Sequence, residues 1–323
     1  SCLAFSARRS DEWSCRGTPG GPRAGRNRRA ERGTNVKNQT FGIEIEMTGI
    51  TREHAARVIA THFGTAVEYV GGTYDTRVAR DQQGRAWKVV SDSSIADTWE
   101  RQTEVVSPIC RWEDIETVQE LVRKLRAAGA KAHTSCGVHV HIGRGAHTPK
   151  TLRNLVNLVN AKEDLLTQAL GISPERRARW CQAVDPDFLA RLNRRKPTTD
   201  AAFAELWYNT PEWRWHASQH YDTSRYHLLN LHSVFQKGTI EFRAFNASLH
   251  AGEIKSFIQL AMAISYQALK SSAASARRPE TDNPKYTFRC WLLRLGFIGD
   301  EFKTAREHLT KRLPGNAAWR RAS

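Results

Sequence analysis

The sequence predicts an α+β protein, in which helices cover one face of an antiparallel or mixed sheet. Three observations support this prediction. Several segments alternate apolar and polar residues with the two-residue period of a strand. Segments with a helical period lie between them along the chain. The 323 residues are 40% hydrophobic, which is enough for a sizeable core.

The strand patterns are bounded by turn residues. DQQG, residues 81–84, predicts a turn between two strands, and Pro108 ends another strand. The segments with a strand pattern are 41–48, 66–70, 74–92 on both sides of the DQQG turn, 101–109, 137–143, 226–235 and 238–246.

The helical patterns carry recognisable ends. Thr51 has the position of an N-cap, and Gly64 follows the end of the same helix. Thr148-Pro149 is typical of an N-cap followed by proline at the first helical position. The segments with a helical pattern are 51–64, 112–129, all of 149–208, about 251–269 and, after a linker at 271–284, two short helices that close the chain.

The net charge of +16 is unevenly distributed. Residues 1–40 hold nine Lys and Arg against three Asp and Glu, and they are rich in Gly and Pro without an apolar period. We therefore expect residues 1–39 to form a disordered basic tail. The remaining +10 is spread over 283 residues without a dense basic block, which argues against nucleic acid as the partner.

Cysteine usage and hydropathy indicate the compartment. The six cysteines form no C-x-x-C pair, which argues against a zinc ribbon, and the chain is long for a disulfide scaffold. No apolar run approaches the ~20 residues of a membrane span. The opening SCLAFSARRS has too short an apolar stretch for a signal peptide. We expect a soluble cytoplasmic protein with reduced thiols and no membrane partner.

Four of the expected strands carry ionisable or amide side chains at alternate positions. Residues i and i+2 of a strand point to the same face, so each strand has one apolar and one polar face. The polar faces hold Glu44 and Glu46, Gln102 and Glu104, His139 and His141, and Glu241 and Arg243. One explanation is an antiparallel sheet with a solvent-exposed face, which requires no function.

The residue types on these faces favour a metal site instead. Four glutamates on one surface would repel one another and raise each other's pKa, and a divalent cation removes that cost. Carboxylates with some imidazole suit Mg²⁺ or Mn²⁺, and substrate phosphates usually complete a magnesium site. Arg243 and Arg225 are then candidates for contacting phosphate. No P-loop and no G-x-G-x-x-G after a strand occurs, so a nucleotide would be held by metals and arginines.

Six short motifs, taken in order, resemble a known family. They are FGIEIE at 41–46, SDSSI at 91–95, TEVVSP at 103–108, GVHVH at 137–141, RYHLLN at 225–230 and TIEFR at 239–243. This set is similar to the amidoligase family, a branch of the glutamine synthetase and glutamate–cysteine ligase superfamily. The resemblance covers about residues 40–269.

The resemblance implies an ATP-dependent carboxylate–amine ligase. Such enzymes use ATP with Mg²⁺ or Mn²⁺ to convert a carboxylate into an acyl phosphate, which an amine attacks to give an amide. The implied fold is α+β, with a curved, mainly antiparallel sheet of about six strands backed by helices and metals on its concave face. The chain then divides into a tail at 1–39, a catalytic domain at 40–270 with a helical insert at about 149–208, and a linker with C-terminal helices at 271–323.

The motifs also imply roles for individual residues. The expected catalytic residues are Arg243, Arg225 and Glu241. The expected metal ligands are Glu44, Glu46, Glu104, His139 and Glu241. The expected nucleotide-binding residues are Arg225, His141, Arg243 and Asn230. Asp92 and Ser94 are placed at the edge of the cleft without an assigned role.

Other functions remain open on the sequence alone. One alternative is a metal-dependent hydrolase, because H-x-H on a strand also occurs in such enzymes. A second is a basic nucleic-acid-binding protein, which the net charge allows. A third is a non-catalytic homologue of the ligases. The ligase interpretation predicts small-molecule or peptide carboxylate and amine substrates, whose identity the sequence leaves open together with the oligomeric state. The Trp-rich segment 207–216 either packs the helical insert, which we favour, or covers a bound ring.

Overall fold

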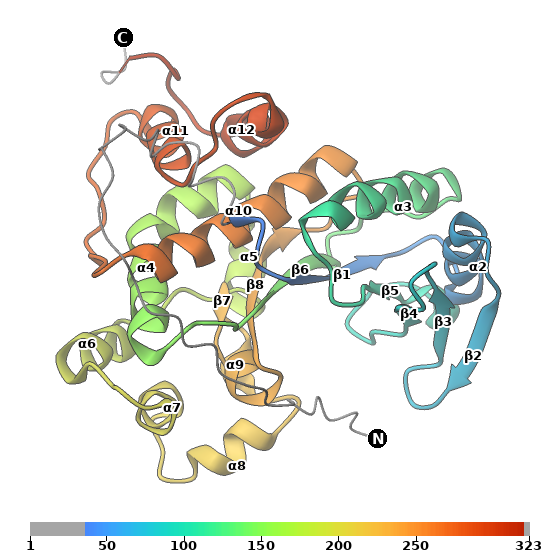
Figure 1. Cartoon of the computed structure of the whole chain (residues 1–323), viewed down its shortest axis with the longest axis horizontal. Helices are drawn as coiled ribbons and strands as arrows, with labels where there is room; N and C mark the ends of the chain where they lie inside the picture. Colours follow the sequence, from blue (N-terminus) through green and yellow to red (C-terminus); the bar gives the residue numbers. More distant parts are fainter. Residues whose placement is uncertain (1–35, 320–323) are drawn as a thin grey trace, which may run out of the picture.

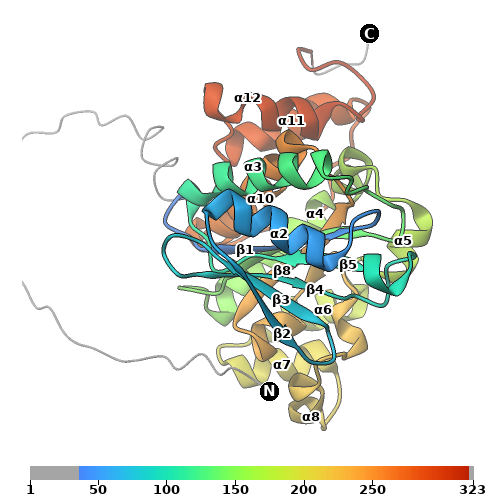
Figure 2. The same cartoon turned by 90° about the vertical axis from the view of Figure 1, so that its right-hand side faces the viewer.

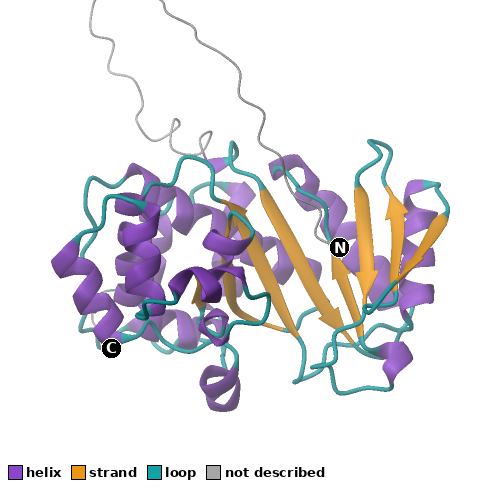
Figure 3. Ribbon diagram, turned by 90° about the horizontal axis from the view of Figure 1, so that it is seen from below, coloured by secondary structure: helices purple, strands orange, loops and turns teal. Residues whose placement is uncertain are grey.

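The computed structural model describes residues 36–319. Its centre is one sheet of eight strands in the order β2-β3-β4-β5-β1-β6-β8-β7, in which every neighbouring pair is antiparallel (Figures 1 and 3). The α+β prediction is confirmed, although the sheet has eight strands and not about six. The strands are β1 (Phe41–Met47), β2 (Val67–Gly71), β3 (Thr76–Arg80), β4 (Ala86–Val90), β5 (Thr103–Val106), β6 (Gly137–Gly143), β7 (Leu229–Asn230) and β8 (Thr239–Asn246).

Helices lie on both sides of the sheet, so the prediction that they cover one face only is wrong (Figures 1 and 2). Their bounds are α2 (Arg52–Phe63), α3 (Ile115–Ala127), α4 (Pro149–Leu170), α5 (Pro174–Arg179), α6 (Pro186–Arg195), α7 (Asp200–Tyr208), α8 (Trp213–Ser218), α9 (His232–Gln236), α10 (Ala251–Lys270), α11 (Pro284–Arg294) and α12 (Lys303–Thr310). Four short 3₁₀ turns complete the described part of the chain: η1 (Trp99–Arg101), η2 (Trp112–Asp114), η3 (Thr223–Arg225) and η4 (Asp300–Phe302).

The alternation of the central strands decides which face of the sheet is apolar. Ile43 and Ile45 of β1 are buried, as are their partners Val140 and Val138 in the neighbouring β6. This apolar face packs against the long helix α10, which contacts both strands. The acidic and imidazole positions between these residues therefore point to the opposite face.

Local signals fix the helix ends as the sequence predicts. The Thr51 side chain accepts a hydrogen bond from the His54 backbone N–H, and Gly64 ends α2 with a positive φ of 67°. Thr148 caps α4 in the same way, and Pro149 occupies its first turn. Each of these residues satisfies backbone groups that a helix end leaves without partners, so the local sequence sets these boundaries.

The prediction of a strand over 226–235 is wrong beyond two residues. Only Leu229 and Asn230 pair with β8, and helix α9 follows from His232. Leu231 has helical angles, and the Asn230 side chain accepts a hydrogen bond from the Ser233 backbone N–H. Asn230 therefore turns the chain out of the sheet, as residues at helix starts commonly do.

The two ends of the described chain join the same core. Val36 is buried, and the Gln39 side chain donates to the Met262 carbonyl in α10, so the packed region begins before Thr40. At the other end, α12 packs against α10 and α11. The expected tail lies outside the described residues for positions 1–35. Within residues 36–319, no helix has the length and apolar character needed to cross a bilayer.

Candidate metal and phosphate site

Backbone register places the predicted acids and imidazoles beside one another on four adjacent strands. Glu46 of β1 lies opposite Glu104 of β5, and Glu44 of β1 lies opposite His139 of β6. One strand further, His141 of β6 lies opposite Glu241 of β8. Directly opposed residues of an antiparallel pair point to the same face, so these six side chains form one patch, here called the acid–imidazole cluster.

Glu44 is the centre of this cluster. Its Oε2 lies 3.1 Å from Nδ1 of His139, and its Oε1 lies 3.2 Å from Nε2 of His141. The two imidazoles therefore converge on one carboxylate. His139 also comes within 3.9 Å of Glu241 and 3.8 Å of Glu46, so one buried ring touches three of the acids.

Neighbouring groups hold the carboxylates in fixed orientations. Glu46 accepts a hydrogen bond of 2.6 Å from the Gly137 backbone N–H. Glu241 accepts 2.6 Å hydrogen bonds from the Asn230 amide and from Nη1 of Arg243. Since each bond occupies only one oxygen or one lone pair, the carboxylates keep further acceptor capacity toward the cluster.

Burial and mutual repulsion divide the four glutamates into two kinds. Burial raises the pKa of Glu46 to about 7, and the charge of Asp92 adds to the rise. Burial and the charges of Glu44 and Glu46 raise the pKa of Glu104 well above its usual range. Two carboxyl groups of the cluster therefore carry a cost for being ionised, which a nearby cation would remove.

The other two glutamates are already stabilised as anions. Burial alone would raise the pKa of Glu44, but the neighbouring His141 and His139 hold it well below its usual value. Burial opposes ionisation of Glu241 too, yet the Arg243 guanidinium holds its pKa at about 2. Burial and the charge of Arg243 lower the pKa of His139 to about 4, so this imidazole is neutral at neutral pH and able to coordinate a metal.

The donor set fits a divalent cation. Three groups of residues each offer ligand atoms that lie within 4.8 Å of one another: Glu44 with His141 and Glu241, Glu44 with Glu104 and His139, and Glu46 with Asp92 and Glu104. Within the described residues, Nε2 of His141 is buried without a hydrogen bond, although it lies beside a Glu44 oxygen. A buried imidazole nitrogen facing carboxylates is a suitable metal donor.

A β-bulge lies beside Arg243 in β8. Between the pairs Val140–Phe242 and Val138–Phe245, β8 has one residue more than β6. Arg243 follows Glu241 by two residues and therefore points to the same face by ordinary strand alternation, and bulges occur often beside functional sites. The guanidinium of Arg243 reaches Glu241, and its centre also lies 5.8 Å from the centroid of the Tyr226 ring.

Arg225 lies apart from the glutamates. Its guanidinium donates to the His220 carbonyl and lies 5.7 Å from the Tyr221 ring and 5.8 Å from the Tyr226 ring. In the stretch 36–319 it forms no ion pair. Tyr226 is therefore near both arginines, because the guanidinium carbons of Arg243 and Arg225 each lie 5.8 Å from its ring centroid.

Three further residues contribute to the site, and the sequence assigned a role to none of them. Asp92 joins the third ligand group, and the Lys237 ammonium lies 4.0 Å from Glu44. Arg176 of α5 donates to the Phe245 and Arg243 carbonyls beside the bulge. The SDSSI motif pointed to Asp92 without a role, whereas no local pattern marks the other two. Gln102, expected beside Glu104, instead precedes β5 and donates to the Ile95 carbonyl.

Fold and site together define a class: an α+β protein with a carboxylate–imidazole cluster on one face of an antiparallel sheet. Residues 37–265 match the family described as "Putative amidoligase enzyme", and the chain belongs to this family. The resemblance in the sequence motifs is thereby confirmed.

One solved structure provides a further comparison. The crystal structure of a bifunctional glutathione synthetase from Pasteurella multocida shares 15% identity with the chain, at a TM-score of 0.39. The match covers 88% of this chain and 48% of that one, so the chain spans about half the length of the synthetase. No curated protein matches the sequence.

Proposed function

We propose that the protein is an ATP-dependent carbon–nitrogen ligase that joins a carboxylate to an amine through an acyl phosphate. The single observation that carries the proposal is the convergence of Glu44, His141 and Glu241 beside Arg243. Membership in the amidoligase family supports the same reaction class. The substrates are a small-molecule or peptide carboxylate and an amine.

The ligand groups would bind different cations. The group of Glu44, His141 and Glu241 lies beside Arg243 and would hold the cation nearest to the ATP phosphates. The group of Glu46, Asp92 and Glu104 lies at the other side of the cluster. When bound, Mg²⁺ or Mn²⁺ neutralises phosphate charge, which is the main requirement of phosphoryl transfer.

Arg243 would contact the transferring phosphoryl group. Its Nη1 donates to Glu241 and its Nε donates to the Trp180 carbonyl, which fixes the plane of the guanidinium. Among residues 36–319, no hydrogen bond engages its Nη2. A guanidinium held in this way offers a preorganised donor to phosphate oxygens.

The proposed reaction has two balanced steps. A substrate carboxylate oxygen attacks the γ-phosphorus of ATP, and the bond from that phosphorus to the β-phosphate bridging oxygen breaks to release ADP. The amine nitrogen then attacks the acyl carbon, the carbon–oxygen bond to phosphate breaks, and the nitrogen loses a proton. The products are an amide, ADP and inorganic phosphate.

An ADP-release assay tests the proposal. Purified protein with Mg²⁺ or Mn²⁺ is supplied with ATP and pools of amino acids, polyamines and peptides, and mass spectrometry identifies any condensed product. We expect ADP release that requires both a carboxylate and an amine. Glu241→Gln should abolish it, while the exposed control Glu212→Gln should retain it.

Other outcomes would overturn the proposal. Substrate turnover without ATP, together with tightly bound zinc, would identify a metal-dependent hydrolase instead. Equal ADP release by wild type and Glu241→Gln would remove the cluster from the reaction. Salt-dependent nucleic-acid binding that survives Glu44→Gln, without any ADP release, would favour the nucleic-acid alternative.

A further inference from the structure

The acid–imidazole cluster is nearly closed to solvent in this structure. His139, Glu241 and Arg243 are between 3% and 5% exposed, and Asn230 is 2% exposed. The triphosphate of ATP is much larger than a water molecule, so it reaches these side chains only after part of the protein moves. The proposed ligase reaction therefore requires an opening over the cluster.

Two segments from distant parts of the sheet meet beside the cluster. One is the loop 72–75 between β2 and β3, and the other is segment 219–226 between α8 and β7 (Figure 1). Six strand spacings separate β3 from β7, which is roughly 29 Å in a flat sheet. The hydroxyl groups of Tyr74 and Tyr221 nevertheless form a hydrogen bond. The two segments therefore reach toward each other across the face of the sheet.

The tyrosine pair lies beside residues of the proposed site. The Tyr74 carbonyl accepts a hydrogen bond from the Ser91 N–H, next to Asp92 of the third ligand group. Burial and the hydrogen bond with Tyr74 raise the pKa of Tyr221 to about 12, and the charge of Asp92 adds to the rise. The Arg225 guanidinium lies 5.7 Å from the Tyr221 ring. The pair is therefore close to a candidate metal ligand and to a proposed nucleotide-binding residue.

The tyrosine hydrogen bond is a single link between two parts of the chain. Among the described residues, no other hydrogen bond or ion pair joins 64–102 to 213–238. The other side-chain hydrogen bonds of segment 219–226 stay within 213–238, such as the 2.6 Å bond between Asp222 and His216 of α8. Both tyrosines are exposed, and a hydrogen bond between exposed groups adds little net stability. This link can therefore open and close.

Tyr74 is the fixed side of the link. The next residue, Asp75, has a positive φ of 46°, which is uncommon for a residue other than glycine. Its buried carboxylate accepts hydrogen bonds from Arg52 at 2.8 Å and from Arg77 at 2.6 Å. Backbone strain that surrounding groups hold in this way is typical of functional sites.

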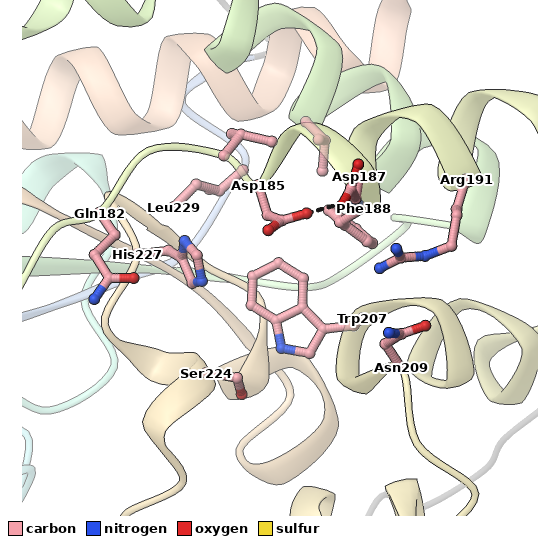
Figure 4. A pocket seen from close by; sticks show the side chains of 12 residues that line it. Gln182, Asp185, Asp187, Phe188, Arg191, Trp207, Asn209, Ser224, His227 and Leu229 are labelled. Carbon is pink, nitrogen blue, oxygen red and sulfur yellow. Dashed lines mark hydrogen bonds between the residues drawn. The ribbon is translucent and has the colours of Figure 1, made fainter.

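Segment 219–226 has room to move away from the β2–β3 loop. A hollow of about 320 Å³, the volume of about ten water molecules, lies between this segment and helices α6 and α7 (Figure 4). Ser224 lines it from the segment and Trp207 from α7, which lies on the side away from β3 (Figure 1). Leu229 of β7 also lines the hollow, whereas Asn230 points into the cluster. The hollow is therefore behind the segment as seen from the cluster.

On the basis of the proposed function, we propose that Tyr74 and Tyr221 form a gate over the acid–imidazole cluster. Their hydrogen bond closes the site in the absence of reactants, and segment 219–226 moves toward α7 to admit them. Arg225 belongs to this segment, so closure brings its guanidinium back to the site. The gate therefore controls both the entry of reactants and the position of Arg225.

Chemical modification of the buried histidines tests the gate in the full chain without nucleotide or metal. Diethyl pyrocarbonate reacts with neutral imidazoles, and mass spectrometry follows its addition to His139 and His141. Because addition occurs only in the open fraction, Tyr74→Phe and Tyr221→Phe should each speed it roughly threefold to tenfold, the effect of one hydrogen bond. The double variant should be no faster than either single variant, because both substitutions remove the same bond.

Two controls separate the gate from general loosening of the fold. Exposed His54 should react at the same rate in every variant. Tyr286→Phe in α11 removes a hydroxyl that forms no hydrogen bond within residues 36–319, and it should leave the reaction of His139 unchanged. Wild-type addition to His139 as fast as to His54, or unchanged rates in both Tyr74→Phe and Tyr221→Phe, would overturn the gate.

Stopped-flow binding of a fluorescent ATP analogue with Mg²⁺ separates the gate from the ligase proposal. Tyr74→Phe and Tyr221→Phe should raise the association and dissociation rates by similar factors, because the same opening precedes entry and release. Slower association in these variants would overturn the gate. If no variant binds the analogue while the histidine modification follows the expected pattern, the ligase function is refuted and the gate is not.

Discussion

The guanidinium of Arg176 fills the space where a side chain at Gly137 would begin. A Cβ added to Gly137 would overlap Nη2 of Arg176 and lie 2.9 Å from its Cζ. The same guanidinium donates to the Cys136 and Phe245 carbonyls. Arg176 thus braces the strand end that donates to Glu46 and the bulge that contains Arg243, and the glycine of the GVHVH motif makes its approach possible.

Gly137→Ala should destabilise the protein. The buried Arg176 would have to move and lose its carbonyl bonds, and overpacking of this kind costs about 1–3 kcal/mol in the free energy of unfolding. Urea denaturation measures the change. Gly42→Ala is the matched control in the adjacent strand, because a Cβ there meets nothing closer than 3.8 Å. Equal loss in both variants would contradict the bracing role of Arg176.

Glu104→Gln should stabilise the protein in EDTA and remove stabilisation by cations. Burial and the neighbouring carboxylates disfavour the charge of Glu104, so the neutral amide should add on the order of 1 kcal/mol to the unfolding free energy. Wild type should gain thermal stability on addition of Mn²⁺ by mass action, and the variant should gain much less. Glu212→Gln, which changes an exposed carboxylate, is the control. A wild-type response to Mn²⁺ in Glu104→Gln would contradict the assignment of Glu104 as a metal ligand.

The two arginines beside Tyr226 should differ in their effects. Arg243→Gln should lower kcat for ADP release about 100-fold or more, because this guanidinium is fixed within the cluster. Arg225→Gln should act mainly on KM for ATP, because Arg225 contacts aromatic rings and not the acids. Steady-state kinetics with Arg214→Gln as control decide this, and a larger kcat loss in Arg225→Gln would reverse the two roles.

Stability should fall on acidification in part because of His147. Its imidazole lies between Thr151 and Ser265, and burial with the charge of Arg144 lowers its pKa to about 4. Its folded pKa lies below the unfolded value of 6.5, so this stabilisation is present above pH 6.5 and is lost as pH falls toward 4. Between pH 8 and 4 the contribution is about 3 kcal/mol. Denaturant titrations should show a smaller pH dependence in His147→Gln than in wild type; equal dependence would contradict the prediction.

The sequence was sufficient wherever a feature depends on local periodicity. Alternation alone placed Glu44 and Glu46 on one face, and His139 and His141 on one face. Cap residues such as Thr51 set helix boundaries through bonds to their own neighbours. The relative register of the strands was not predicted, because no single strand encodes its partner.

The features that escaped prediction depend on contacts distant in sequence. The bulge at Arg243 exists between β6 and β8, and Arg176 reaches it from 67 positions away. Asn230 lies in a strand-like pattern, yet its bond to the Ser233 N–H starts a helix there. Such preferences of a single side chain override an apolar period, which is too short here to decide between strand and helix.

The family match stops at residue 265, but the folded unit does not. Phe288 and Leu292 of α11 and Leu309 of α12 are buried in the core that α10 shares with the sheet. Recombinant versions trimmed to residues 37–265 would lack α11, α12 and the last turn of α10, and the side of α10 that packs against α12 would be exposed to solvent. Shortened versions of this chain should therefore aggregate and express poorly unless both α11 and α12 are retained.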